Sequence, residues 1–281
     1  MKVLIAGCGY VGNVLAALLL QKGHVVYGLK RDISTLPDGV QAVRGDLTDA
    51  ATLTALPDNI DSLVFLPTPA SRDQVAYESI FLDGWKNLWN SLKQAPARTL
   101  LISSTAVYGQ SDGRIVSEET TPEPARFNGE VLLQMEQLAA SCTAQLIVAR
   151  VSGIYGPGRE GLIRLAASEG LEIQQSPPNF TNRIHLDDVA AALMHLLLMD
   201  DPQAMYLVSD DLPVTRYDVL AWIAAALGKP APKGLNVDPG NGGKRVDNQR
   251  LRSSGFRLNY PDDRAGYGAI LKDRGTSEHT W

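Results

Sequence analysis

The feature that most constrains the fold is a glycine-rich turn at the start of the chain. Lys2–Ala6 has the apolar pattern of a buried strand, Gly7-Cys8-Gly9-Tyr10-Val11-Gly12 follows it directly, and an apolar helix is predicted over Gly12–Lys22. In such a G-x-G-x-x-G turn the first glycine permits a tight turn, the second lets a pyrophosphate approach the backbone, and the third lets helix and strand pack closely. The N–H groups and the dipole at the helix start attract phosphates. We therefore predict a dinucleotide-binding turn formed by these six residues; a glycine turn without a ligand is the alternative.

Strand-like and helix-like segments alternate after this turn, which predicts an α/β fold built on a Rossmann-type, doubly wound parallel sheet. Apolar runs such as Leu63–Leu66 are typical of strands that are covered on both faces. The predicted strands are Lys2–Ala6, His24–Leu29, Gln41–Arg44, Ser62–Leu66, Thr99–Ser103 and Gln145–Val151. The predicted helices between them are Gly12–Lys22, Ala51–Leu56, Arg72–Gln94 and Phe127–Ser141.

The alternation loosens in the C-terminal part, where helices are predicted over Asp187–Met199 and Arg216–Leu227. We expect residues 1–153 to form the dinucleotide-binding domain, with residues 183–208 contributing to it. Residues 154–182 and 209–273 are expected to form a smaller, interleaved substrate lobe. The polar residues 274–281 are expected to be a loosely ordered tail.

The composition excludes several classes of protein. A net charge of -5 and a pI near 5.4 argue against a nucleic-acid partner, because such binders usually carry a basic face. The apolar stretch Val14–Leu20 is too short to span a bilayer, so no membrane partner is expected. The two cysteines are too few for a disulfide framework and lack metal-ligand spacing. This use of cysteine favours a reducing, cytoplasmic location. Because the strand begins directly after Met1, we also expect no signal peptide.

The end of the second predicted strand bears on the choice between NADP and NAD. An NAD site places an acid there to bind the ribose 2′-hydroxyl, whereas this chain has Lys30 and Arg31, which suit a 2′-phosphate. Asp32 comes one or two residues late, although a shifted turn could bring it in. The pattern favours NADP over NAD, and ordinary exposed charges after a strand are the alternative.

The residues after the third predicted strand are candidates for contacts with adenine. Asp46 can accept a hydrogen bond from the adenine amino group, and Leu47 can pack on the ring. The alternative is a helix N-cap formed by Thr48 or Asp49, and both roles can hold at once.

Four later segments follow the glycine turn in a characteristic order: Ser103–Gly109, Arg150–Gly158, Arg183–Asp188 and Lys244–Pro261. Together they resemble the extended short-chain dehydrogenase/reductases, the NAD-dependent epimerase/dehydratase family. The resemblance covers nearly the whole chain, and it implies a Rossmann fold with a small C-terminal substrate lobe.

The resemblance also implies roles for single residues. Ser104, four residues before Tyr108, takes the place of the serine that faces the reacting carbon–oxygen group. Thr68 is placed near the nicotinamide ribose, and Tyr155 near the nicotinamide. The expected cofactor-binding set also includes Leu66, Pro67 and Ser103. For Ser104 the alternative is a hydroxyl that bonds the backbone at the end of a strand.

The family's catalytic tyrosine and the lysine four residues later are missing. The tyrosine acts as acid and base, and the lysine holds the nicotinamide ribose and lowers the tyrosine pKa. No tyrosine lies between Tyr108 and Tyr155, and no lysine lies between Gln94 and Gly228. With Glu136 as the point of alignment, the tyrosine position is Asn128 and the lysine position is Leu132.

Other residues could replace the missing pair, and the substrate also departs from the family pattern. Tyr155, Tyr108 and His185 are the candidates for acid/base work. Thr181 stands where sugar-nucleotide members carry an arginine, so a sugar nucleotide is not favoured, although Arg183 lies nearby. The substrate is expected to be a small molecule of unknown identity.

Three functions fit these observations. The first is an oxidoreductase-like enzyme with non-standard acid/base residues, and the second is a non-catalytic NADP(H)-binding sensor or regulator. The third is an interaction protein that keeps the fold for structure alone. The chain is expected to be a monomer or a homodimer, because the apolar side chains on the predicted helix Arg72–Gln94 can face either a partner or the sheet.

Overall fold

The computed structural model of the chain describes residues 1–237 and 241–276, with side chains described through residue 273. These residues divide into two compact units. Unit 1 comprises Met1–Gly109, Pro122–Arg150 and Ala190–Tyr206. Unit 2 comprises Gln110–Thr121, Val151–Val189 and the described residues from Leu207 onward.

Unit 1 is built on a parallel sheet of seven strands in the order β12-β7-β5-β4-β1-β2-β3. Its strands are β1 (Lys2–Ala6), β2 (Val25–Lys30), β3 (Gln41–Arg44), β4 (Ser62–Phe65), β5 (Arg98–Ser104), β7 (Leu146–Val151) and β12 (Met205–Val208). The strands β2 and β3 lie on one side of β1, and β4 and the later strands lie on the other side. A doubly wound sheet binds its ligand where the strand order changes sides, here between β1 and β4. The prediction of a Rossmann-type sheet is confirmed, and the six predicted strands differ from the observed ones by at most one residue at either end.

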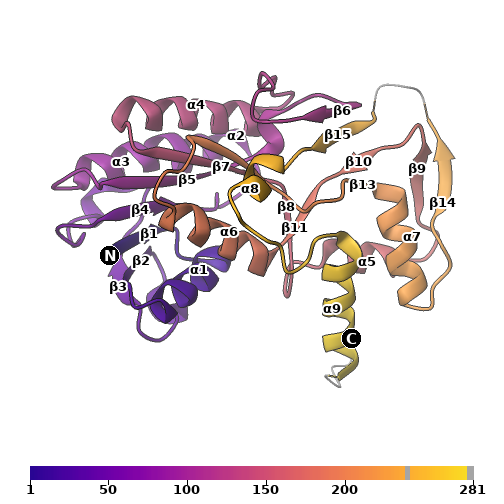
Figure 1. Cartoon of the computed structure of the whole chain (residues 1–281), viewed down its shortest axis with the longest axis horizontal. Coiled ribbons are helices and arrows are strands. Elements are labelled where there is room, and N and C mark those ends of the chain that lie inside the picture. The colour runs from indigo at the N-terminus through magenta and orange to yellow at the C-terminus, as the bar shows by residue number, and fades with distance from the viewer. Residues whose placement is uncertain (238–240, 277–281) are drawn as a thin grey trace. The chain divides into compact units, whose positions relative to one another are not determined.

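Helices cover both faces of this sheet (Figure 1). They are α1 (Tyr10–Gln21), α2 (Gln74–Glu78), α3 (Gly84–Ser91), α4 (Phe127–Cys142) and α6 (Leu186–Leu198), which begins in unit 2. Trp85 of α3 is fully buried, and its ring meets the ring of Phe65 on β4 edge-on at 5.2 Å. This face of α3 therefore packs on the sheet, and a homodimer stays a prediction.

Two helix predictions in unit 1 were wrong in detail. The predicted helix Ala51–Leu56 is only a 3₁₀ turn at Ala50–Thr52, because the Thr52 hydroxyl bonds back to the carbonyls of Asp46 and Asp49 and Pro57 disfavours helix before it. The predicted helix Arg72–Gln94 starts later, at Gln74, where the Asp73 carboxylate caps it. It also contains a π-helical segment at Ser79–Asp83 between α2 and α3.

Unit 2 contains three small sheets. The largest has the order β13-β10-β15-β6, and the two pairs are β11-β8 and β14-β9. The strands are β6 (Asp112–Val116), β8 (Gly153–Tyr155), β9 (Glu172–Ser176), β10 (Phe180–Thr181), β11 (Arg183–His185), β13 (Val214–Thr215), β14 (Lys233–Asn236) and β15 (Gly243–Val246). Residues 110–121, 151–153, 183–189 and 207–208, which were expected in the dinucleotide domain, fall in unit 2, where β6 pairs with β15 and β11 pairs with β8.

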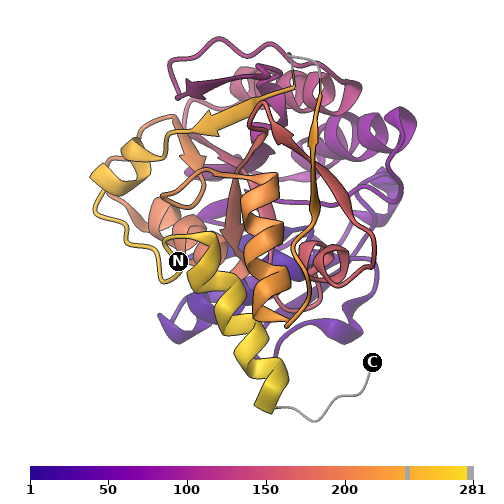
Figure 2. The same cartoon turned by 90° about the vertical axis from the view of Figure 1, so that its right-hand side faces the viewer.

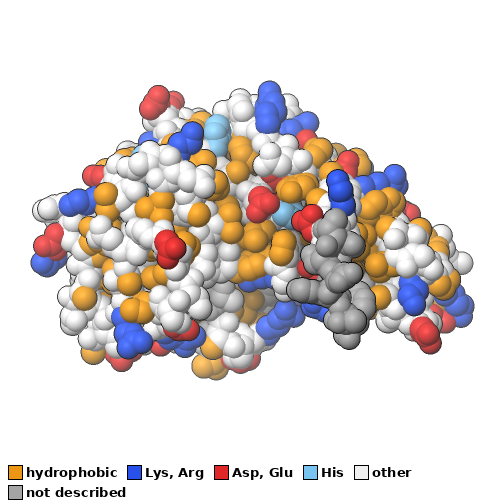
Figure 3. All heavy atoms as spheres, turned by 90° about the horizontal axis from the view of Figure 1, so that it is seen from below, with side chains coloured by type: hydrophobic (Ala, Val, Ile, Leu, Met, Phe, Trp, Pro, Cys, Tyr) orange, Lys and Arg blue, Asp and Glu red, His pale blue; other side chains and the backbone are white. Residues whose placement is uncertain are grey.

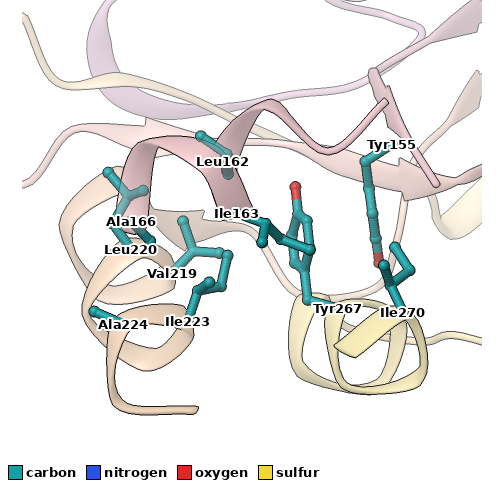
Figure 4. Close-up of a cluster of buried hydrophobic side chains, with 10 residues drawn as sticks. All are labelled: Tyr155, Leu162, Ile163, Ala166, Val219, Leu220, Ile223, Ala224, Tyr267 and Ile270. Carbon is teal, nitrogen blue, oxygen red and sulfur yellow. The ribbon is translucent and has the colours of Figure 1, made fainter. Parts of the chain in front are cut away.

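The helices of unit 2 are α5 (Gly161–Ala166), α7 (Arg216–Ala226), α8 (Gln249–Ser253) and α9 (Asp263–Thr276). Figure 2 shows α7 and α9 side by side. Between α5, α7 and α9 lies a cluster of buried side chains in which the rings of Tyr155 and Tyr267 stack at 4.2 Å (Figure 4). Residues 274–276 complete α9, and the remainder of the predicted tail, 277–281, lies outside the described residues.

Candidate functional site

The glycine turn joins β1 to α1 and has the geometry that its sequence predicts. Gly7 has φ +92°, and a Cβ there would lie 2.6 Å from the Cα of Pro67, so a larger residue would clash with the loop after β4. The N–H groups of Gly7 and Cys8 donate to the carbonyl of Leu29 at 3.0 and 3.2 Å, which fixes the turn against β2. Gly9 is the N-cap of α1 and has no side chain to cap it. The start of α1 is therefore built to receive an anion.

A cavity of about 420 Å³ opens beside this turn, and its walls all belong to unit 1. The lining residues come from the glycine turn, from the ends of β2, β3 and β4, and from α2 with the π-helical segment. They are Gly7, Gly9, Leu29, Lys30, Arg31, Asp32, Gly45, Asp46, Leu47, Thr48, Pro67, Thr68, Ala70, Ala76, Ser79 and Ile80. The cavity thus lies at the carboxyl ends of parallel strands, where open α/β sheets bind ligands.

The structure brings most of the predicted cofactor residues to this cavity. Eight of them line it: Gly7, Gly9, Lys30, Arg31, Asp46, Leu47, Pro67 and Thr68. The others predicted in the turn and in the loop after β4 lie outside its lining, and among them Cys8, Val11, Gly12 and Leu66 are buried while Tyr10 is half-buried. Burial raises the pKa of the Cys8 thiol to about 11, so this thiol is a packing group. The contributions of Ala76, Ser79 and Ile80 were not predicted, since small and apolar residues on a helix carry no signal of a ligand.

The charged residues at the end of β2 make different hydrogen bonds. The Lys30 ammonium donates to the Thr35 hydroxyl at 2.6 Å. One carboxylate oxygen of Asp32 accepts from the N–H and the hydroxyl of Ser34, at 3.0 and 2.7 Å, and these hydrogen bonds hold the Asp32 pKa below its ordinary value. Asp32 therefore caps the short 3₁₀ turn Ile33–Thr35.

Asp46 and Arg31 face each other at the cavity. Asp46 Oδ1 accepts from the N–H and the hydroxyl of Thr48, at 3.0 and 2.8 Å. The other oxygen, Oδ2, lies 3.8 Å from a guanidinium nitrogen of Arg31. Of the two N-cap candidates, Asp49 is the one that caps the following turn, by accepting from the N–H of Ala51. Asp46 does not cap this turn, and it lines the cavity.

The predicted catalytic positions of unit 1 lie around the end of β5. Ser104 is half-buried, and its Oγ accepts from the N–H of Ala106 at 3.1 Å. Asn128 is half-buried in the first turn of α4. The next residue, Gly129, packs directly on the carbonyl of Ala106. The start of α4 therefore lies against the turn that Ser104 caps.

The side chains of Ser103 and Leu132, by contrast, are enclosed. Ser103 is buried, and its hydroxyl has no hydrogen-bond partner among the described residues. Leu132 is only 5% exposed and packs in the core, so its side chain is a packing group.

Tyr108 belongs to a buried network rather than to an open site. The Arg150 guanidinium binds the Glu136 carboxylate through two nitrogens, at 2.6 and 3.0 Å, and donates to the Tyr108 hydroxyl at 2.6 Å. All three side chains are buried. The network ties β7 to α4 and to the turn after β5, so it holds these elements in place.

Tyr155 and His185 lie inside unit 2. Tyr155 is 1% exposed, its hydroxyl lies against Gly266 of α9, and this hydroxyl has no hydrogen-bond partner within the described chain. Burial raises the pKa of Tyr155 and lowers that of His185. The His185 ring meets Tyr155 edge-on at 5.4 Å and accepts from the N–H of Asp187. Within unit 2, both rings are packed against neighbouring side chains.

A model of the NAD dependent epimerase/dehydratase family matches residues 3–208, which include the glycine turn and β12. The chain belongs to this family. The Escherichia coli (strain K12) protein YeeZ is 29% identical over 276 residues, covering 93% of this chain and 97% of that protein. A 3-diazoavenalumate denitrifying reductase from a Streptomyces species is 27% identical over 257 residues, covering 84% of each chain. A solved structure of a proposed NAD-dependent epimerase/dehydratase from Methylobacillus flagellatus is 35% identical with a TM-score of 0.83, covering 98% of each chain.

These matches confirm the resemblance seen in the sequence. The chain is a Rossmann protein of the short-chain dehydrogenase/reductase type, from a family that depends on a nicotinamide dinucleotide. Among the described residues, no helix has the length and apolar character needed to cross a membrane.

Proposed function

We propose that the chain is an oxidoreductase-like enzyme that binds NADPH in the cavity of unit 1 and uses it on a small molecule. The observation that carries the proposal is the cavity itself. It is lined by Gly7 and Gly9 of the turn, by Lys30 and Arg31 at the end of β2, and by Thr68 after β4. This order, from the phosphate-binding turn to the ribose-binding strand end, fits one dinucleotide.

The charges after β2 support NADP rather than NAD. An NAD site needs a carboxylate that accepts from the ribose 2′-hydroxyl. Both Asp32 and Arg31 line the cavity, but one oxygen of the Asp32 carboxylate is engaged by Ser34, whereas the Arg31 side chain is 69% exposed. A guanidinium matches the geometry of a phosphate and binds it through two nitrogens.

The cofactor would supply a hydride at its nicotinamide, and the proposed role of the protein is to orient the reacting group. Because the Ser104 oxygen already accepts from Ala106, its own hydrogen can donate to a substrate oxygen or nitrogen. Asn128, at the family's tyrosine position, can donate a hydrogen bond but cannot act as an acid at neutral pH. The site thus favours substrates that need little help from a strong acid, and a reductase is among its relatives.

A non-catalytic NADP(H) sensor is the second candidate. It is supported by Asn128 and by Leu132, whose burial in the core leaves no cation at the lysine position. We further propose a cytoplasmic location, a monomer or homodimer, and no nucleic-acid partner. The face in Figure 3 carries Lys and Arg side chains in small groups among acidic, apolar and uncharged ones, which accords with the net charge of -5.

The test is a titration of the purified protein with NADPH and with NADH, followed by nicotinamide fluorescence and by thermal shift. Tight binding that selects NADPH, with selectivity lost in Lys30→Ala and Arg31→Ala, is the expected result. Arg44→Ala is the matched control, since Arg44 ends the neighbouring strand β3 but does not line the cavity. A protein that binds neither dinucleotide refutes the proposal.

A second experiment separates the enzyme from the sensor. Small electrophiles are screened for oxidation of NADPH by the wild type and by Ser104→Ala. Turnover by the wild type that falls in Ser104→Ala, at unchanged NADPH affinity, supports the enzyme. Tight NADPH binding without turnover of any compound favours the sensor.

A further inference from the structure

The two oxygens of the Asp46 carboxylate have different surroundings. Oδ1 is held by the N–H and the hydroxyl of Thr48, which fixes the direction of the carboxylate. Oδ2 faces Arg31 at 3.8 Å. Both side chains line the same cavity, so this ion pair lies where a dinucleotide would enter.

A phosphate can replace Asp46 as the partner of Arg31, because the Arg31–Asp46 ion pair is weak. Arg31 is 69% exposed and Asp46 is 30% exposed, and ion pairs in such positions are weak because water screens them. A phosphate offers Arg31 two oxygens and up to two negative charges, whereas Asp46 offers one oxygen at long range. A phosphate that arrives at Arg31 therefore displaces the carboxylate.

We infer that Asp46 sets cofactor selectivity by competing with the 2′-phosphate of NADPH for Arg31. This inference rests on the proposed function, because it requires a dinucleotide in the cavity. NADPH replaces the carboxylate at Arg31 with a better anion, while its phosphate is repelled by the carboxylate that it displaces. The 2′-hydroxyl of NADH gains nothing from Arg31 and leaves the pair as it is. Asp46 thus lowers the affinity for NADPH relative to NADH.

A contact between Asp46 and adenine does not change the ratio of the NADPH and NADH dissociation constants. NADPH and NADH carry the same adenine, so a hydrogen bond from its amino group to Asp46 changes both dissociation constants equally. The ratio of the two constants therefore reports on the exchange at Arg31 and on the repulsion between the Asp46 carboxylate and the 2′-phosphate.

The experiment measures dissociation constants for NADPH and NADH in the wild type, Asp46→Asn, Arg31→Ala and the double variant. Asparagine keeps an oxygen that can accept from Thr48, so the turn is preserved, and a thermal melt checks the fold. The ratio of the NADH constant to the NADPH constant should rise about threefold to fivefold in Asp46→Asn, which is the effect of losing one exposed ion pair. The rise should be clearly smaller when the substitution is added to Arg31→Ala, where only the repulsion between the Asp46 carboxylate and the 2′-phosphate remains. The rise should also shrink at high salt.

Asp49→Asn is the matched control, since Asp49 lies in the same loop but caps the next turn. An unchanged ratio in Asp46→Asn, or an equal rise in the Arg31→Ala background, would overturn the inference and leave the proposed function standing. If the wild type binds neither NADPH nor NADH, both fall together.

Discussion

The burial of the Asp210 carboxyl in unit 2 predicts how the free energy of unfolding changes with pH. Its side chain is 2% exposed, and neither carboxylate oxygen has a hydrogen-bond partner among the described residues. Burial raises the Asp210 pKa from 3.8 to about 8, the nearby carboxylates of Asp263, Asp211 and Asp262 add to this shift, and Arg183 opposes it. The folded protein therefore keeps this carboxyl protonated at neutral pH.

The sign and size of the effect follow from proton linkage. Between pH 3.8 and about 8, the folded state holds a proton on Asp210 that the unfolded state has lost. The free energy of unfolding must then fall as the pH rises, by about 1.4 kcal/mol per pH unit from this one group. Over the whole window the loss is on the order of 5 kcal/mol, which is a large part of the stability of an ordinary domain.

The assay is urea unfolding of the wild type and of Asp210→Asn from about pH 5 to about pH 8. Asparagine has the same shape and no charge, so the variant should gain stability relative to the wild type with each step up in pH. Other groups with raised or lowered pKa, such as Asp263 and His185, are present in both proteins and largely cancel. Asp201→Asn, at an exposed position, should follow the wild type. Parallel pH profiles for the wild type and Asp210→Asn would refute the reasoning.

Three further substitutions test the structure. Gly7→Ala adds a clash at a residue with positive φ, so it should lower the free energy of unfolding by at least about 1–3 kcal/mol and abolish NADPH binding. A thermal melt and a titration measure the two effects. The control Gly23→Ala, with φ +78° and open space around it, should bind NADPH normally. Glu136→Gln leaves the buried guanidinium of Arg150 without its counter-charge, so urea unfolding should show a free energy of unfolding lower by about 3–5 kcal/mol. A loss below about 1 kcal/mol would contradict the role given to this buried network. Tyr155→Phe should leave stability and any NADPH turnover nearly unchanged, because the buried hydroxyl makes no hydrogen bond within the described chain; a large loss of turnover would restore Tyr155 as a catalytic candidate.

The sequence predicted the parts of the fold that are encoded locally. The strands of the large sheet are short apolar runs bounded by turns, and the glycine turn couples φ, packing and anion binding within six residues, so both were visible. The pairing of β6 with β15 joins segments more than a hundred residues apart and leaves no local pattern. For the same reason, the division into units was not predicted in full.

Only part of the candidate site could be predicted from the sequence. Lys30 and Arg31 were recognised because charge at a strand end is a local signal. The burial of Tyr155 under α9 depends on Gly266, far along the chain, and could not be read from the motif around the tyrosine. The facing of Arg31 and Asp46 depends on β2 and β3 lying side by side, which only the structure shows.

The central claim is that a dinucleotide binds in the cavity of unit 1, and amide hydrogen exchange with and without NADPH tests it most directly. NADPH should slow exchange in peptides that cover residues 7–12, 29–32, 46–48 and 66–68, where the turn and the strand ends line or support the cavity. Residues 167–172 and 229–233, around a second cavity in unit 2, should not change. Protection of that second cavity alone, or no protection at all at saturating NADPH, would contradict the account.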